Sequence, residues 1–229
     1  MLRLIAVLLL LAMSPARAAE RADLALVLAV DASASVDPEE YQLQLSGIAA
    51  AFRDPAVLAA IRSGPSRRIA VEILEWADHQ VPKSSTGFHS IGSAGEAEAF
   101  ASVAEAFPRH QNGATGIGEG IAAALRDLDN TDIDASRRVI DVSGDGRETP
   151  AREYVVLLPQ ARAMAYEREV TINGLAITNE DATLADYYRD AVALGADSFV
   201  MSVTDYTAFA AAMRRKLIRE IQAPAVSLN

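Results

Sequence analysis

The chain has 229 residues, of which 51% are hydrophobic and 23% are charged, and its formal net charge is -10. This balance is typical of a packed globular domain rather than a disordered chain. The excess of 31 acidic over 21 basic residues disfavours nucleic-acid binding, because an acidic chain repels a phosphate backbone unless its basic residues gather on one face. The absence of cysteine excludes disulfides, thiolate zinc sites, iron–sulfur clusters and cysteine nucleophiles.

The first 18 residues have the pattern of a cleavable signal peptide. Arg3 supplies the positive charge, residues 4–12 are apolar, and Ala16-Arg17-Ala18 is a small-x-small cleavage motif. The alternative is an N-terminal membrane anchor, but this apolar run is well short of the ~20 residues that cross a bilayer. We therefore expect cleavage after Ala18 and a periplasmic or secreted product without a membrane span.

The first predicted strand covers Leu24–Val30, where the continuous apolar run LALVLAV is typical of a strand buried on both faces. A helix is expected to follow this strand. Asp37 can cap the helix, Pro38 fits its first position, and Glu39 and Glu40 suit its positive end.

The rest of the chain alternates between predicted strands and helices. Strands are expected over residues 69–76, 138–143, 170–177 and 198–203, with a weak edge strand within 81–91. Helices are expected over residues 95–106, 116–128, 154–168, 184–193 and 206–221. This order predicts an α/β fold with a doubly wound, mostly parallel sheet, flanked by helices on both faces and joined by right-handed crossovers. No repeat or long linker indicates a second domain, so we expect one domain over residues 22–221 and a C-terminal tail over 222–229.

Oxygen-bearing side chains follow the first predicted strand, in Asp-Ala-Ser-Ala-Ser at residues 31–35. Open sheets of this kind bind ligands beyond the carboxyl ends of their strands. Side chains two apart in an extended segment point the same way, so Asp31, Ser33 and Ser35 can present a carboxylate and two hydroxyls to one point. Oxygen ligands are those that a hard cation such as Mg²⁺ prefers. Alternatively, Ser33 or Ser35 makes turn or cap hydrogen bonds before the helix.

Two later glycine-rich segments are also candidates. The sequence NGATGIGEG at residues 112–120 precedes a predicted helix, but a dinucleotide-binding fingerprint would directly follow a strand, and residues 107–111 have the character of a loop. Thr115 either caps this helix or has a functional role. Asp145 follows the strand over 138–143 and lies between two glycines, an arrangement that by itself is more typical of a turn.

Taken together, these segments resemble the von Willebrand factor A-like domain and its metal-ion-dependent adhesion site. That family has Asp-x-Ser-x-Ser after its first strand, a threonine in a loop before a helix, and Asp-Gly after a later strand. Asp31, Ser33, Ser35, Thr115 and Asp145 match this pattern in order and in setting. The motifs IDVSGDG at residues 140–146 and YYRDAV at 187–192 further resemble a bacterial exported subfamily described as a domain of unknown function.

The resemblance implies a bound Mg²⁺, with Mn²⁺ or Ca²⁺ as alternatives. It implies direct ligation by Ser33 and Ser35, ligation by Thr115 directly or through water, and ligation by Asp31 and Asp145 largely through water. The implied partner is a protein that offers an Asp or Glu carboxylate to the metal. Family members often carry Asn a few residues after the Asp-Gly, whereas this chain has Arg-Glu-Thr at residues 147–149, so the assignments end at Asp145.

An enzyme is the main alternative class. A metal-dependent hydrolase acting on a phosphoester or ester would need a general base beside the metal-bound water. His79, His89 and His110 are scattered without metal-ligand spacing, and His110 is the strongest candidate because it lies five residues before Thr115. No Gly-x-Ser-x-Gly motif of a serine hydrolase occurs. We therefore predict a metal-dependent binding module without catalytic residues.

Three further features have both a functional and a structural interpretation. Asp141 shares strand parity with Asp145, so it either orients the site or makes a buried structural hydrogen bond. Glu75 and Trp76 end the second long strand, where core packing is favoured over a role in the site. The basic run at 214–219 is predicted to be a solvated face of the last helix rather than a phosphate site.

Overall fold

The computed structural model describes residues 20–150 and 154–222. The predicted signal peptide at 1–18 and all but the first residue of the predicted tail lie outside the described residues. Within those two ranges, no helix is long and apolar enough to cross a membrane.

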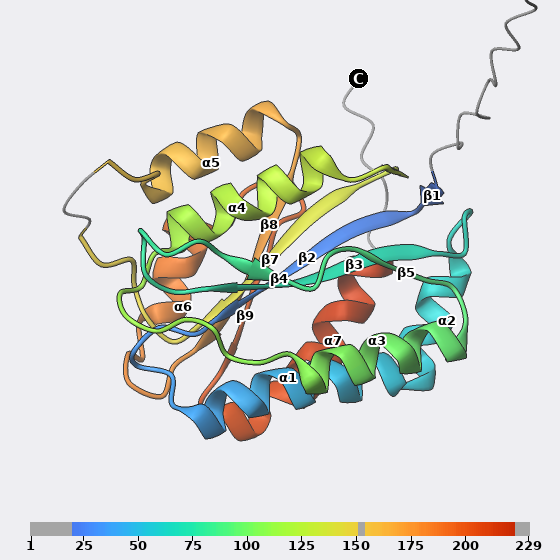
Figure 1. The fold of residues 1–229 in the computed structure, drawn as a ribbon, viewed down its shortest axis with the longest axis horizontal. Helices are drawn as coiled ribbons and strands as arrows, with labels where there is room; N and C mark the ends of the chain where they lie inside the picture. Colours follow the sequence, from blue (N-terminus) through green and yellow to red (C-terminus); the bar gives the residue numbers. More distant parts are fainter. Residues whose placement is uncertain (1–19, 151–153, 223–229) are drawn as a thin grey trace, which may run out of the picture.

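A seven-stranded sheet forms the middle layer of the molecule (Figure 1), in the order β4-β3-β2-β7-β8-β9 with β5 also paired to β3. The strands are β2 (Leu24–Asp31), β3 (Ile69–Trp76), β4 (Ser84–Ser85), β5 (His89–Ile91), β7 (Arg138–Gly144), β8 (Thr171–Ile177) and β9 (Val200–Val203). All pairs are parallel except those of β4 and β5 with β3. The weak edge strand predicted within 81–91 is therefore two short antiparallel strands, and the predicted doubly wound, mostly parallel sheet is confirmed.

Helices cover both faces of the sheet (Figure 1). One face carries α1 (Pro38–Arg53), α2 (Pro55–Ser63), α3 (Ala94–Ala106) and α7 (Phe209–Gln222). The other face carries α4 (Ile117–Asn130), α5 (Leu158–Glu167) and α6 (Leu184–Tyr187). β2 supplies both cores in alternation, with Leu26 and Leu28 in the first and Val27 and Ala29 in the second. This explains why the whole strand is apolar.

Local capping chemistry places α1 as predicted. The Asp37 side chain accepts a hydrogen bond from the Glu40 N–H at 2.8 Å, and the Glu40 side chain accepts one from the Asp37 N–H at 2.9 Å. This reciprocal capping box fixes the helix start directly after the Ser-rich loop. The neighbouring helix α2 was not predicted; it begins at Pro55, and Asp54 caps it by accepting from the Ala56 N–H at 2.7 Å.

Two predicted helices differ from the structure. The helix predicted over 154–168 begins only at Leu158, and Tyr154 is fully exposed. Pro159 explains the difference, because within a longer helix its ring would clash with the Val155 carbonyl and leave that carbonyl without a donor. The helix predicted over 184–193 is the α-helical turn α6 followed by a π-helical turn over Tyr188–Val192.

Both ends of the described chain lie at one edge of the sheet (Figure 1). The short strand β1 (Glu20–Ala22) directly precedes β2 and pairs in parallel with β6 (Ile133–Ala135). At the other end, the Ile221 carbonyl in the last turn of α7 accepts a hydrogen bond from Arg137, beside the amino end of β7. The carboxyl ends of the parallel strands therefore point to the opposite edge.

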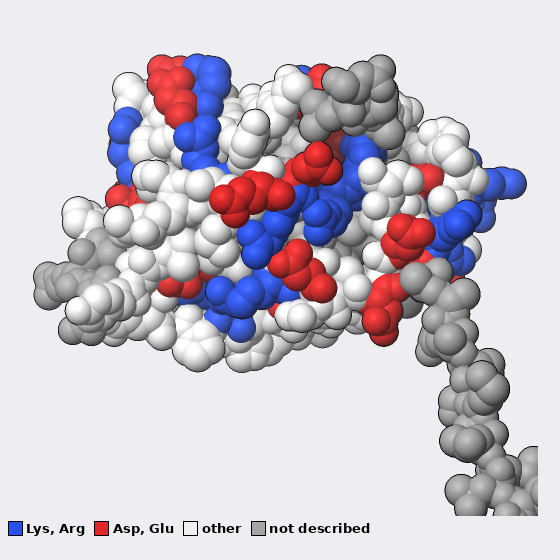
Figure 2. All heavy atoms as spheres, turned by 90° about the horizontal axis from the view of Figure 1, so that it is seen from above, with Lys and Arg blue, Asp and Glu red and all other residues white. Residues whose placement is uncertain are grey.

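Charged side chains are mixed on the face covered by α4 and α5. Figure 2 shows basic and acidic groups interspersed there, and ion pairs such as those of Asp129 with Arg138 and Arg168 contribute to this mixture. The described basic side chains on this face thus form no continuous surface of one sign of the kind that a phosphate backbone requires.

Candidate metal site

The carboxyl ends of β2 and β7 bring two aspartates to one edge of the sheet. These strands pair in parallel with Val30 opposite Ser143, so Asp31 at the end of β2 lies near Asp145 just beyond β7. Both side chains are buried. Neither carboxylate forms an ion pair within residues 20–150 and 154–222. Two ionised carboxylates this close repel each other, which makes a neighbouring cation favourable.

The two serines link the aspartates through hydrogen bonds. Asp31 Oδ1 accepts from the Ser33 N–H at 2.7 Å, the Ser33 and Ser35 hydroxyl oxygens lie 3.2 Å apart, and Ser35 Oγ donates to Asp145 Oδ1 at 2.7 Å. The predicted convergence of the Asp31, Ser33 and Ser35 side chains is present, but the expectation of an extended segment was wrong. A turn in which the Val36 N–H bonds to the Ser33 carbonyl brings the hydroxyls together, not an extended segment. Neither serine caps α1, because Asp37 does.

Thr115 reaches the same edge from the loop before α4. The N-cap of α4 is Gly116 without a side-chain hydrogen bond, so the alternative that Thr115 caps this helix is wrong. A Cβ built on Gly146, the residue after Asp145, would lie 3.4 Å from Thr115 Oγ1. Thr115 is mostly buried, and its hydroxyl makes no hydrogen bond to the described part of the chain. The structure thus links Asp31, Ser33, Ser35 and Asp145 by hydrogen bonds and places Thr115 beside the residue that follows Asp145.

Burial and charge leave Asp31 electrostatically unsatisfied. Burial, followed by the negative charge of Asp145, raises the pKa of Asp31 to about 7. Its Oδ2 is buried and has no hydrogen-bond partner among the described residues. A buried polar atom without a partner is costly, and a proton or a cation removes that cost. Gly144 leaves room for this oxygen, since a Cβ there would lie 2.7 Å from it.

The residues present fit a hard divalent cation. All the candidate ligands are oxygens, two from carboxylates and three from hydroxyls, which matches the preference of Mg²⁺ and still leaves room for a further oxygen ligand. No cluster of three or more His, Asp or Glu that could hold a metal occurs within residues 20–150 and 154–222. The candidate site at this edge combines two carboxylates with serine and threonine hydroxyls.

Several residues that hold the site together were not predicted. Arg109 donates to the carbonyls of Ala32 and Ser33, each at 2.9 Å, and so fixes the loop after β2. Gln44 on α1 donates to the Asp31 carbonyl at 2.9 Å. A signal for Gln44 existed, because it is a polar residue on the apolar face of a predicted helix, whereas Arg109 lies in a loop without a distinctive pattern.

Glu75 organises the loop that leads to Thr115. Its buried carboxylate accepts the backbone N–H groups of His110 and Gln111, each at 2.8 Å. The His110 ring also contacts Glu75, with Nδ1 3.1 Å from Oε2. His110, the strongest histidine candidate for a general base, is therefore held by Glu75. Trp76 is fully buried in the core, as predicted.

Asp141 and Lys216 of the basic run meet beneath α7. The Lys216 Nζ lies 2.8 Å from Asp141 Oδ1 and 2.5 Å from Glu220 Oε1, and Lys216 is fully buried. The prediction that residues 214–219 form a solvated face is therefore wrong for Lys216, because two buried carboxylates hold its ammonium group. Asp141 is accordingly part of a structural ion cluster under α7, which is the second of its two interpretations.

Known proteins similar to this chain share its fold. The sequence matches the family model described as "Protein of unknown function (DUF1194)" over residues 21–225. No curated protein matches the sequence. Similar solved structures include proximal thread matrix protein 1 from the mussel byssus, with 13% identity and a TM-score of 0.59 over 89% of this chain and 47% of that one. The same mussel protein has also been solved with a zinc-occupied MIDAS motif, at 13% identity and a TM-score of 0.59 over 87% of this chain and 46% of that one.

Two bacterial pilus proteins are also similar. The vWF domain of the type V pili tip protein Mfa5 from Porphyromonas gingivalis has 12% identity and a TM-score of 0.56 over 90% of this chain and 98% of that one. The pilus adhesin SpaC from Lactobacillus rhamnosus GG has 12% identity and a TM-score of 0.59 over 87% of this chain and 31% of that one. This chain spans less than half the length of the mussel protein and of SpaC. At these identities, the likenesses show the von Willebrand factor A fold.

Proposed function

Because the chain belongs to the DUF1194 family and has the von Willebrand factor A fold, we propose that it is an exported binding module whose metal site engages an acidic group of a partner protein. Export is supported by the signal-peptide pattern of residues 1–18. Protein binding is supported by the adhesin and pilus-tip proteins that share the fold. A shared fold alone does not assign a function, so the argument rests chiefly on the site.

The observation that carries the proposal is the chain of hydroxyls between two buried carboxylates. Ser33 and Ser35 connect Asp31 to Asp145, and Thr115 lies beside the residue that follows Asp145. In our proposal these five residues hold Mg²⁺, with Mn²⁺ or Ca²⁺ as alternatives. A cation held by these residues would offer a coordination position to a carboxylate oxygen of the partner.

The rival class, a metal-dependent hydrolase, receives less support from the same geometry. Hydrolysis needs a general base within hydrogen-bond reach of the attacking water. Within the part of the chain that the structure describes, no histidine makes a hydrogen bond to any of the five site residues. We therefore propose binding rather than turnover as the function.

Thermal unfolding with and without metal tests the proposal. Mg²⁺ or Mn²⁺ is expected to raise the melting temperature of the wild-type protein, since an ion that binds only the folded state stabilises it. Asp31→Ala is expected to abolish this rise. Asp37→Ala is the matched control, because it removes a nearby carboxylate that caps α1 and should keep the metal-dependent rise. An equal rise in Asp31→Ala and wild type would refute the site.

A second experiment separates binding from catalysis. Exported proteins captured by the wild type with Mg²⁺, and released by a chelator or lost with Ser33→Ala, would support the binding module. The same protein is to be assayed with generic phosphoester and ester substrates. Metal-dependent turnover that disappears in Asp145→Ala would instead favour the hydrolase.

A further inference from the structure

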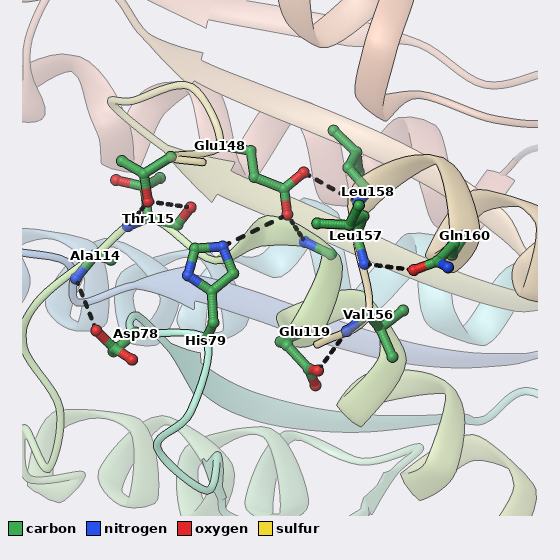
Figure 3. A network of polar contacts seen from close by, with 12 residues as sticks. Asp78, His79, Ala114, Thr115, Glu119, Glu148, Val156, Leu157, Leu158 and Gln160 are labelled. Carbon is green, nitrogen blue, oxygen red and sulfur yellow. Dashed lines mark hydrogen bonds and ion pairs between the residues drawn. The ribbon is translucent and has the colours of Figure 1, made fainter. Parts of the chain in front are cut away.

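Glu148 connects the beginnings of two helices next to the site (Figure 3). Its Oε1 accepts from the Gly118 N–H and its Oε2 from the Leu158 N–H, both at 3.0 Å. These N–H groups belong to the first turns of α4 and α5. Carboxylates are favoured at helix amino ends, where N–H groups lack partners within the helix, and here one carboxylate serves two helices.

Thr149 forms hydrogen bonds with both the carbonyl and the N–H group of Thr115. The Thr149 N–H donates to the Thr115 carbonyl at 3.0 Å, and the Thr115 N–H donates to Thr149 Oγ1 at 3.2 Å. The hydroxyl of Thr115 is not used by either contact. Two consecutive residues therefore fix both the loop that contains Thr115 and the helix that follows it.

The packing around Glu148 leaves little freedom for these segments. A Cβ built on Gly118 would lie 2.5 Å from the Val156 carbonyl oxygen and 2.6 Å from the Leu158 nitrogen, so α4 and the segment before α5 meet backbone to backbone. His79 closes another side, with its Nε2 3.9 Å from Glu148 Oε1 (Figure 3). The Glu148 side chain is only 12% exposed.

We propose that Glu148 and Thr149 are positioning residues of the metal site. They fix Thr115 relative to Asp145, so that the threonine hydroxyl and the aspartate carboxylate face the same cation. Asp145 is three residues before Glu148 in the chain, whereas Thr115 comes from a separate loop, so these contacts set the distance between two ligands that the sequence separates. The inference rests on the proposed function, because it assigns these residues to the same metal site. Residues that orient ligands in this way typically contribute about 10- to 100-fold in metal affinity.

Thr149 offers the sharpest test, because its hydroxyl can be removed in one variant and kept in another. Thr149→Val keeps the size of the side chain and removes the acceptor of the Thr115 N–H, whereas Thr149→Ser keeps the acceptor. Mn²⁺ affinity is measured by calorimetric titration of the whole protein. We expect binding about 10-fold weaker in Thr149→Val and close to wild type in Thr149→Ser. Hydrogen exchange of the Thr115 amide in metal-free protein is expected to be faster in Thr149→Val only.

Glu148 is tested by mutation, with Glu119 as the control because its carboxylate also accepts a backbone N–H. Glu148→Ala removes the acceptor of two helix N–H groups and is expected to weaken Mn²⁺ binding by about 10-fold or more, with a smaller loss in Glu148→Gln. Glu119→Ala is the control, since Glu119 accepts the Val156 N–H at 2.6 Å but, within the described residues, makes no hydrogen bond to Thr115, Glu148 or Thr149. Its Mn²⁺ affinity should equal that of the wild type. If Glu148→Ala does not fold, the Thr149 pair decides.

The outcomes separate this inference from the proposed function. A wild-type protein that binds no Mn²⁺ refutes the metal site and, with it, the positioning role. A wild type that binds Mn²⁺ with the same affinity as Thr149→Val refutes the positioning role alone. Faster exchange of the Thr115 amide without any loss of Mn²⁺ affinity would likewise show that these contacts serve only the fold.

Discussion

Tyr206 donates its phenolic hydrogen bond to Asp145 Oδ2 across 3.0 Å, and both side chains are buried. The other oxygen of the same carboxylate accepts from Ser35. Tyr206 begins the 3₁₀ turn that leads into α7. One carboxylate therefore ties the last helix of the described chain to the loop after β2.

Removal of this hydroxyl should destabilise the protein. Tyr206→Phe leaves a buried carboxylate oxygen without its donor, which typically costs about 1–3 kcal/mol. Urea denaturation measures the free energy of unfolding. Tyr166→Phe is the control, because Tyr166 is 75% exposed and should unfold like the wild type. Equal stability of both variants would show that the Tyr206 hydrogen bond contributes nothing.

The buried ion cluster should be sensitive to loss of its cation. Lys216→Met removes the ammonium group that pairs with both Asp141 and Glu220, and breaking such a buried cluster typically costs about 3–5 kcal/mol. A triple variant that combines Lys216→Met with Asp141→Asn and Glu220→Gln is expected to recover part of the lost unfolding free energy. Arg215→Met on the exposed side of α7 should change little. A Lys216→Met protein as stable as Arg215→Met would contradict the structural role of the cluster.

Glu72 should make stability fall as the pH rises. Burial, reinforced by its hydrogen bond with Asp127, raises the pKa of Glu72 to about 9. The folded state then binds a proton that the unfolded state has released, so the free energy of unfolding decreases from about pH 4.5 to about pH 9. Glu72→Gln mimics the protonated acid and should be more stable than the wild type at pH 8, by about 1–4 kcal/mol. Parallel stability curves for the two proteins between pH 5 and pH 9 would refute this assignment.

Gly144 should not tolerate a side chain. A Cβ there would lie 2.7 Å from both Asp31 Oδ2 and the Tyr188 hydroxyl oxygen, so Gly144→Ala forces one of them to move. We expect a loss of about 1–3 kcal/mol in unfolding free energy and a smaller metal-dependent rise in melting temperature. Gly95→Ala is the control, because nothing lies within 4 Å of its added Cβ, and it should be neutral or slightly stabilising. A fully stable Gly144→Ala would show that the neighbouring groups relax at no cost.

The sequence predicts the sheet well because burial determines its pattern. Leu24–Val30 is apolar without interruption, and the structure places it in the centre of the sheet between β3 and β7. The same order of strands and helices predicts which loops share an edge, which is why Asp31 and Asp145 could be assigned to one place. The helix predicted over 154–168 begins later, at Leu158, because Pro159 is tolerated only in the first turn of a helix.

Contacts between residues that are far apart in the chain could not be predicted from the sequence. Lys216 belongs to a run of basic residues that is typical of an exposed helix face, and its buried partner Asp141 is 75 positions away in the chain. Arg109 and Thr149 likewise act through contacts with backbone groups of distant loops. Backbone groups carry no sequence signal, so such contacts become visible only once the loops are placed.

The two described ends of the chain leave the molecule at the edge opposite the candidate metal site. Attachment to a surface near Glu20 or Gln222 would therefore leave the edge that holds Asp31 and Asp145 on the side away from that surface. An affinity tag or a sensor coupling at either place should not obstruct an approaching partner.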